Sequence, residues 1–390
     1  MKKKISYLLL IVMITLTLAG CNNSAKQNES LFAAVENAAK IEKCEYEVSA
    51  DIKFNDEQAN NIKFVVKGKK DGNKVTIGAL VNFLFFEFNI DEIMVVTEDA
   101  AYLNVEDIVK NVNNIITLMG SQSIDLNEML GVSVKWLELP FSKELLSTMT
   151  TDDYVNLSTQ MLQEALKDVT ITDTDETHTV IINNIGELLD IVKNLLDSVV
   201  AHKEEIKNIL TNANVNEAAI KDTIDLYIND ILKAVNRVNV DLNLGLTEES
   251  IKELEDEMKG ELNDLFDGAD YENALDEMKT KLDESFAELE DNIDEIKKAL
   301  DENKDDIDVD LSVSFSNSLT GKNGSRVYTT ELAVNMVEED TDLSLIFNGK
   351  MTENKKISIA KPDDSLSFED ACYYVIKMLA ENDGNFEIFE

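Results

Sequence analysis

The residue best placed for covalent chemistry in this sequence is Cys21, in the stretch LTLAGCNNS. It directly follows Leu18, Ala19 and Gly20, and a small-residue site of this kind suits the cleavage of an export signal. Cleavage between Gly20 and Cys21 would make the cysteine the new N-terminus. The alternatives are an ordinary signal peptide, or an N-terminal helix in which a cysteine happens to occur.

The residues that precede Cys21 favour export and lipid attachment. Three lysines follow Met1, and the 16 residues of 5–20 then carry no charge. As a helix they would be about 24 Å long, shorter than the roughly 30 Å hydrocarbon core of a bilayer, which is typical of a signal rather than a permanent span. Residues 18–21 resemble the bacterial lipobox. This resemblance implies that residues 1–20 are a lipoprotein signal peptide and that the mature chain is extracytoplasmic, anchored by lipid to the cell membrane.

The segment after the cysteine predicts a tether. Residues 21–30 are mostly polar and show no helical or strand periodicity, so they are expected to be a flexible link. Nine extended residues reach at most about 30 Å. The folded body, residues 31–390, would therefore stay close to the membrane.

Few other residues have the types and spacing of a chemical site. Neither His178 nor His202 has a second histidine or a cysteine at zinc-ligand spacing. No nucleophile elbow or glycine-rich phosphate loop is present, and with 77 acidic residues a pair of carboxylates carries no information. The sequence predicts no catalytic residue, no metal ligand and no cofactor, and a protein that is not an enzyme.

Two smaller groups of residues each have an alternative interpretation. Residues 301–310 offer several carboxylates, but they lack the glycine and the final glutamate of a calcium-binding EF-hand loop. Asp308 and Asp310 instead alternate with apolar residues, as on the solvent face of a strand. Cys44 and Cys372 could form a disulfide that closes a long loop, or they could be two buried free thiols.

Composition and charge narrow the classes of function. The formal net charge is −41, or −44 once the three signal lysines are removed, and 44% of the residues are hydrophobic. The body can therefore bury a large core. Its negative charge should repel nucleic acid and anionic lipid head groups.

Alternation of apolar and polar residues predicts the fold class. Residues 44–54 alternate strictly, as expected for an antiparallel strand with one solvated face. Residues 62–81 predict a hairpin that turns at Asp71 and Gly72, and further strands are expected at residues 82–90, 237–246 and 356–360. The fold class predicted is α+β, with a large curved antiparallel sheet, half-barrel-like, and several packed helices.

Residues 82–90 are unusual because their apolar residues are consecutive rather than alternating. The stretch NFLFFEFNI contains four aromatic residues: Phe83, Phe85, Phe86 and Phe88. A central strand covered on both faces would explain this pattern. The alternative is that these side chains line an apolar pocket.

Residues 247–306 form the most acidic segment, with 24 acids and seven lysines. Thr247 is expected to cap a first helix, and from Tyr271 to Leu300 apolar residues recur in steps of three and four, as in a coiled-coil seam. Gly268 between the two predicts an antiparallel helical hairpin. It could pack on the body, project as an arm, or dock a cationic partner.

Several local features together resemble the LolA-like and LppX-like half-barrel lipoproteins. They are the lipobox, the opening helix that leads into residues 44–54, the passage AAYLNVEDIV at residues 100–109 and the stretch VKWLELPF at residues 134–141. The resemblance implies a curved antiparallel sheet around helices, which can hold acyl chains. The acidic hairpin and two central helices, predicted at about residues 185–210 and 217–235, depart from a minimal domain of this type and could fill the concave side.

Two functions are expected from these observations. The first is a non-enzymatic, lipid-anchored envelope lipoprotein that binds an apolar or lipid ligand between sheet and helices. The alternative is a protein-interaction module that uses the acidic hairpin as an arm or docking face for an envelope protein. The partners expected are the membrane through the lipid anchor and a lipid or an envelope protein, and no nucleic acid.

Overall fold

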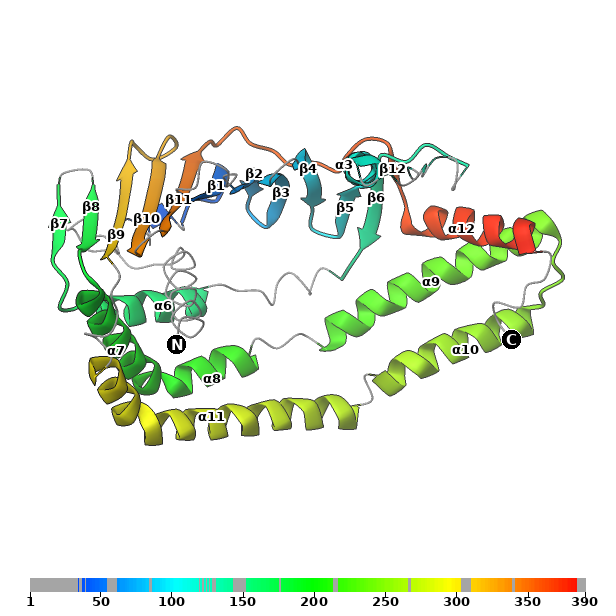
Figure 1. The fold of residues 1–390 in the computed structure, drawn as a ribbon. Helices are drawn as coiled ribbons and strands as arrows, with labels where there is room; N and C mark the ends of the chain where they lie inside the picture. The colour runs from blue at the N-terminus through cyan, green and yellow to red at the C-terminus, as the bar shows by residue number, and fades with distance from the viewer. Residues whose placement is uncertain are drawn as a thin grey trace.

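A computed structural model gives the arrangement of the chain (Figure 1). It describes residues 34, 37–38, 40–54, 62–83, 86–118, 120, 123, 125, 127, 131–142, 152–174, 177–212, 217–265, 268–302, 310–338 and 341–383. Within these residues the protein is α+β, with twelve strands in one open sheet and eight helices. No helix among them has the length and hydropathy needed to cross a membrane.

The sheet is large and almost entirely antiparallel. Its strands are β1 (Lys43–Phe54), β2 (Ile62–Asp71), β3 (Lys74–Phe83), β4 (Phe86–Val96), β5 (Ala100–Asn104), β6 (Trp136–Pro140), β7 (Ile171–Asp173), β8 (His178–Ile182), β9 (Asp310–Thr320), β10 (Val327–Glu338), β11 (Thr341–Glu353) and β12 (Ser365–Leu366). Their order is β12-β6-β5-β4-β3-β2-β1-β11-β10-β9-β8-β7, and β12 with β6 is the parallel pair. The predicted α+β class with a large antiparallel sheet is confirmed, and the open sheet is consistent with the curvature expected.

Strand β1 defines the two faces of the sheet. One face carries Tyr46, Val48, Ala50 and Ile52 and is called the apolar face, and the other carries Glu45, Glu47, Ser49 and Asp51 and is called the polar face. Ala50 stands directly opposite Phe64 on β2 and Phe347 on β11. Because directly opposite residues share a face, the apolar face continues across the neighbouring strands.

Two helices cover the apolar face at the β7–β10 end. They are α6 (Asp152–Ala165) and α7 (Ile185–Ala201). The core there is made of buried side chains from α6, α7, β8, β9 and β10: Leu162, Ala165, Leu166, Val180, Ile182, Leu188, Ile191, Leu311, Val313, Phe315, Leu332 and Val334. Asn184 starts α7 by accepting a hydrogen bond from the Glu187 backbone N–H, which satisfies one of the free donors of the first turn.

At the other end of the sheet, the polar face is covered instead. Tyr102 and Trp136 are buried there with Ile357 and Ile359, which lie in the chain between β11 and β12. Helix α3 (Val105–Leu118) follows β5, and α12 (Phe368–Asp383) packs against α9 (Glu217–Leu242) beside β6.

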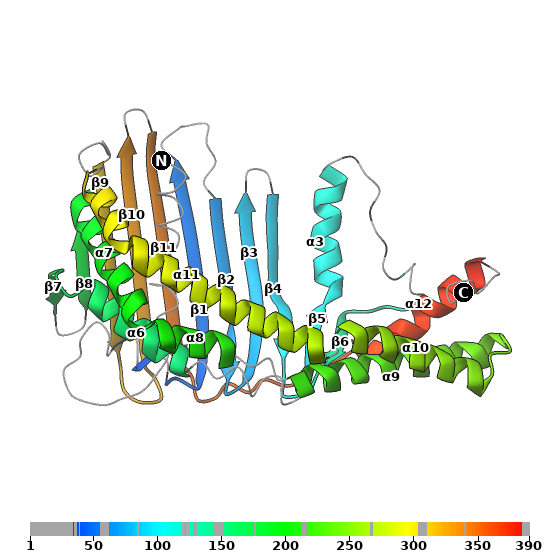
Figure 2. The same cartoon turned by 90° about the horizontal axis from the view of Figure 1, so that it is seen from below.

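The remaining helices form an arch that joins the two ends of the sheet on its apolar side, as Figures 1 and 2 show. The helical arch consists of α7, α8 (Lys203–Asn212), α11 (Gly268–Glu302), α10 (Glu248–Leu265) and α9. Helix α11 packs on α7 and α8, and α10 packs on α9. Among the described residues, no helix packs extensively against β1, β2, β3 or β11.

The two acidic helices are present, but their pairing with each other is not confirmed. Thr247 caps α10 as expected, with its Oγ1 accepting a hydrogen bond from the Ser250 backbone N–H at 3.1 Å. Helix α10 folds back along α9, whereas α11 continues away from α10 toward α7 (Figure 1). The antiparallel pair in this region is therefore α9 with α10.

Three strand predictions were wrong. Residues 82–90 span the end of β3 and the start of β4 rather than one strand. Residues 237–242 continue α9, because Val238 packs in a helical contact with α12 while Val240 is 78% exposed. Residues 356–360 form no ladder, although Ile357 and Ile359 are buried.

Candidate functional site

The central strands expose a contiguous group of apolar side chains on the apolar face. Val48 is 47% exposed, Phe64 42% and Val66 43%. Val48 stands directly opposite Val66, and Ala50 directly opposite Phe64. Cross-strand partners of this kind have Cβ atoms about 5 Å apart, so the three exposed side chains adjoin. We call Val48, Phe64 and Val66 the central apolar patch.

Phe64 is the exposed end of a row of apolar residues that runs across the sheet and is buried at its other end. Phe64, Ala50, Phe347, Leu332 and Phe315 stand opposite one another in turn, from β2 to β9. Leu332 is 3% exposed and Phe315 6% exposed, because α6 and α7 cover them. The five residues of this row are all apolar, and what changes toward the centre is that no described helix packs extensively over them. A contiguous exposed apolar group of this kind commonly marks a binding surface.

Two of the aromatic residues predicted to line a pocket, Phe86 and Phe88, lie on β4, two strands from Phe64. Phe83 stands opposite Phe86, and Val81 opposite Phe88. Because Val81 also stands opposite Phe64, this register puts Phe88 and Phe86 on the apolar face, where both are half-buried. Phe85 lies outside the described residues.

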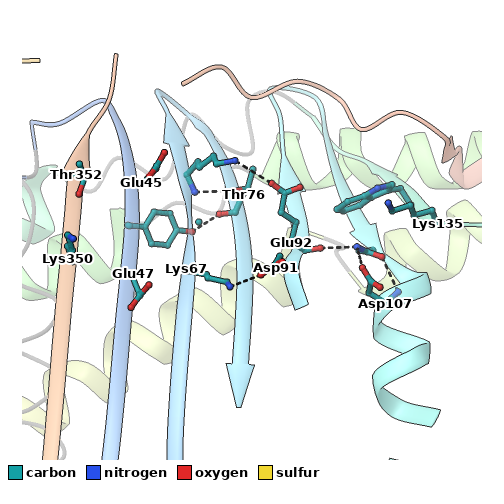
Figure 3. Close-up of a pocket in the computed structure, with 15 residues that line it drawn as sticks. Glu45, Glu47, Lys67, Thr76, Asp91, Glu92, Asp107, Lys135, Lys350 and Thr352 are labelled. Carbon is teal, nitrogen blue, oxygen red and sulfur yellow. Dashed lines mark hydrogen bonds and ion pairs between the residues drawn. The ribbon is translucent and has the colours of Figure 1, made fainter. Parts of the chain in front are cut away.

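The opposite face carries a second candidate, a polar pocket of about 570 Å³. Figure 3 shows it spanning the strands from β11 to β6. Its lining residues are Glu45, Tyr46, Glu47, Lys67, Gly68, Lys69, Thr76, Asp91, Glu92, Asn104, Asp107, Lys135, Trp136, Lys350 and Thr352. We call this site the polar pocket.

Much of the charge in the polar pocket is neutralised by neighbours. The Lys67 ammonium lies 2.6 Å from the Asp91 carboxylate and lowers the pKa of Asp91 by hydrogen bonding and by its charge. Lys69 lies 3.9 Å from Glu92. Such pairs fix side chains along the solvent side of β2 and β4, and they are worth little as stabilising contacts because they are exposed.

The floor of the polar pocket depends on glycine. The hydroxyl of Tyr46 donates a 2.8 Å hydrogen bond to the Thr76 carbonyl, and a Cβ atom at Gly68 would lie 2.7 Å from that hydroxyl oxygen. Gly78 marks a register shift between β3 and β4, where a Cβ atom would lie 2.0 Å from the Asp91 carbonyl. Both close approaches exclude a side chain.

Asn104 orders the side of the polar pocket next to α3. Its carbonyl oxygen accepts from the Asp107 backbone N–H at 3.1 Å, which caps α3, and its amide donates to the Glu92 carbonyl at 3.0 Å. Asn104 is 3% exposed. A buried amide with these partners rigidly joins the start of α3 to β4.

Of the other predicted residues that the structure describes, none lines the polar pocket or belongs to the central apolar patch. Gly20 and Cys21 lie outside the described residues. Cys44 on β1 is buried and Cys372 on α12 is half-buried, and no disulfide joins them here. Burial raises the pKa of the Cys372 thiol to about 11, which keeps it protonated at neutral pH.

The two histidines lie on separate elements. His178 on β8 is buried opposite Asn317. His202 ends α7, with Nε2 3.1 Å from Glu164 and Nδ1 3.0 Å from Glu205. Of the carboxylates considered for calcium, Asp301 pairs with Lys193 and Asp310 begins β9. In the part of the chain that the structure describes, no group of three or more His, Cys, Asp or Glu side chains could hold a metal ion.

Sequence reasoning missed the polar pocket and the exposure of the patch. The residues of both are brought together by pairing across the sheet, and the one available signal was the glycine at position 68 within an alternating strand.

Comparison of this chain with protein-family models, curated proteins and solved structures found no match.

Proposed function

We propose that this protein is a non-enzymatic lipoprotein, anchored through Cys21 to the outer side of a bacterial cell membrane, whose central strands bind an acyl chain. The single observation that carries the binding function is the central apolar patch. Three large apolar side chains that adjoin on one face, each more than two-fifths exposed, expose surface that water solvates poorly.

The anchor supports an acyl chain as the occupant. The tether of residues 22–30 reaches at most about 30 Å, so the sheet would work within reach of the bilayer that supplies such chains. The net charge of −41 disfavours a strongly anionic head group. A neutral or zwitterionic lipid is the ligand class that fits both facts.

Photo-crosslinking in membranes tests this proposal. The full lipid-anchored chain is placed in phosphatidylcholine vesicles that contain a diazirine-labelled phosphatidylcholine, irradiated, and mapped by peptide mass spectrometry. We expect adducts on residues 43–71, which hold β1 and β2. The double variant Phe64→Ser, Val66→Ser should lose most of them.

A matched control is available on the polar face. Ile181 on β8 is 49% exposed and points away from the apolar face, because it alternates with the buried residues Val180 and Ile182. Ile181→Ser should leave the adducts on residues 43–71 unchanged. Absence of those adducts in the wild-type chain, or an equal yield in the double variant, would overturn the proposal.

The alternative function is a protein-interaction module that uses the acidic helices. The observation that favours it is that α11 exposes several carboxylates, among them Asp291, Asp294 and Glu295. Deleting residues 247–306 should then abolish a crosslinked envelope partner while the remaining body stays folded. Loss of the folded body on deletion would instead assign these helices to the framework.

A further inference from the structure

We propose that α11 is a releasable strap, held on α7 and α8 by a row of ion pairs, that controls entry of the ligand to the central apolar patch. This inference rests on the acyl-binding function proposed above. It concerns how the patch is reached, and it is carried by contacts between helices that lie far apart in the sequence.

The four ion pairs run in antiparallel order along the helices. Lys193 on α7 lies 2.6 Å from Asp301, and Asp197 contacts Lys297. On α8, Lys203 lies 2.6 Å from Glu290 and Lys207 lies 2.5 Å from Asp283. Residue numbers rise along α7 and α8 while those of the partners on α11 fall. We call these four contacts the ion-pair row.

Apolar contacts contribute to this interface, but few of them are fully buried. Among the described side chains of α11, which begin at Glu277, Phe286 is buried at 9% exposed and Ile296 is 36% exposed, and the other apolar residues of the seam are half-buried: Leu282, Leu289, Ile293 and Leu300. Phe286 also makes a cation–π contact, because the Lys207 ammonium lies 5.8 Å from the centre of its ring. Helix α11 is therefore held by a partly buried apolar seam together with ion pairs that salt weakens.

The charge of α11 favours its release once the ion-pair row is broken. Residues 268–302 contain 13 acids and four lysines, and the body on which they lie is also acidic. The three lysines that α7 and α8 supply, together with Lys297, offset this repulsion locally. Without them, like charges would push the helix away from the body.

Helix α11 lies where its release would change access to the central apolar patch. Figures 1 and 2 together show α11 running across the apolar side of the sheet, from the α7 end toward the α9 end. No described helix packs extensively on β1 or β2, which carry the patch. Movement of α11 would therefore widen access to the patch without breaking the core under α6 and α7.

The test combines charge reversal with two measurements on the full lipid-anchored chain in phosphatidylcholine vesicles. The variant Lys203→Glu, Lys207→Glu removes half of the ion-pair row. Hydrogen exchange of α11 amides should become faster, and the rate at which diazirine-labelled phosphatidylcholine forms adducts on residues 43–71 should rise about fourfold, taking about a factor of two for each of the two surface pairs removed. Adding Asp283→Lys and Glu290→Lys to this variant should restore both values.

A control with the same kind of charge reversal, at a single lysine, lies within α11. Lys281 pairs with Glu277 one turn away on the same helix, so Lys281→Glu should change neither measurement. Unchanged exchange and unchanged adduct rate in Lys203→Glu, Lys207→Glu would overturn the strap while leaving the proposed function intact. Absence of adducts in every variant would overturn the proposed function, and the control of entry with it.

Discussion

Val48 stands directly opposite Val66 in the β1–β2 ladder, and both side chains are more than two-fifths exposed. The next pair along the same ladder is Ser49 with Val65, and each of these is 8% exposed. In the centre of the sheet the apolar face is thus more accessible than this part of the polar face. This reversal of the usual pattern for an antiparallel sheet is the basis of the proposed binding surface.

The reversal predicts that substitutions on the apolar face of β1 and β2 change the free energy of unfolding less than a substitution on the polar face. The double variant Val48→Thr, Val66→Thr keeps β-branched residues in both strands, so we expect the free energy of unfolding to change by no more than about 0.5 kcal/mol per site. Val65→Thr places a hydroxyl in a buried position and should cost about 1–3 kcal/mol. Urea unfolding followed by circular dichroism measures both. Equal costs would show that the patch is covered in solution.

Part of this fold could be predicted from local patterns. Strict alternation over residues 44–54 predicted β1, and Gly72, with a φ of 61°, turns the β2–β3 hairpin close to where it was expected. Such features depend on a few neighbouring residues, which a sequence displays directly.

The errors in the prediction arose where one pattern satisfied two structures. Apolar residues alternate as in a strand at Val238, Val240 and Leu242. They also recur at helical spacing at Val235, Val238 and Leu242. The helix forms because this second set lets α9 pack against α12. β3 ends at Phe83 and β4 begins at Phe86, and the two residues between them in the sequence, Leu84 and Phe85, are not of the types that predict a turn.

The candidate sites were less predictable than the fold. Lys67 and Asp91 are 24 residues apart in the sequence, and Lys193 and Asp301 are 108 apart. Which lysine meets which acid depends on the register of the sheet and on the packing of helices. A single sequence with 77 acidic residues offers no way to choose between them.

Gly68 provides a prediction about the polar pocket. A Cβ atom there would lie 1.8 Å from the Thr76 carbonyl oxygen and 2.7 Å from the Tyr46 hydroxyl oxygen. Gly68→Ala should therefore lower the free energy of unfolding by about 1–3 kcal/mol. Gly260 in α10 has no atom within 4 Å of such a Cβ, so Gly260→Ala should stabilise by about 0.5–1 kcal/mol. The two variants, compared by urea unfolding, should shift the midpoint in opposite directions.

His202 predicts a dependence on pH. Hydrogen bonds from the imidazole to Glu164, and then to Glu205, raise the pKa of His202 above its ordinary value of 6.5. A group with a raised pKa in the folded protein stabilises it fully below the unfolded pKa, and this contribution is lost as the pH rises through the folded pKa. His202→Gln should therefore destabilise the protein at pH 6 and have less effect at pH 9.

Proton NMR can test which of the two carboxylates, Glu164 or Glu205, raises the pKa of His202 more. The chain has two histidines, so the imidazole signals can be assigned with His202→Gln. Glu164→Gln should lower the pKa of His202 more than Glu205→Gln does, because the Glu164 contact has the larger effect. The opposite order would mean that α8, rather than α6, holds the imidazole.

Glu353 makes the strongest prediction about acid stability. Its carboxylate accepts from the Arg326 Nε at 2.9 Å, from the Arg326 Nη2 at 3.2 Å and from the Gly324 backbone N–H at 2.7 Å. These contacts lower the pKa of Glu353 from 4.5 to about 2, chiefly through the Arg326 guanidinium. Because the carboxyl is 8% exposed, Glu353→Gln should cost about 2–3 kcal/mol at pH 7.

The sign of the pH effect follows from the lowered pKa. A carboxyl with a folded pKa below its unfolded value stabilises the protein above the unfolded value, and the contribution is lost as the pH falls through the folded pKa. The difference in unfolding free energy between wild type and Glu353→Gln should thus be constant from pH 7 to about pH 5 and shrink toward pH 2. Glu331 on the neighbouring strand β10 is exposed, and Glu331→Gln should not show this cost. A difference for Glu353→Gln that stays constant down to pH 2 would show that the Arg326 contact is replaced by water in solution.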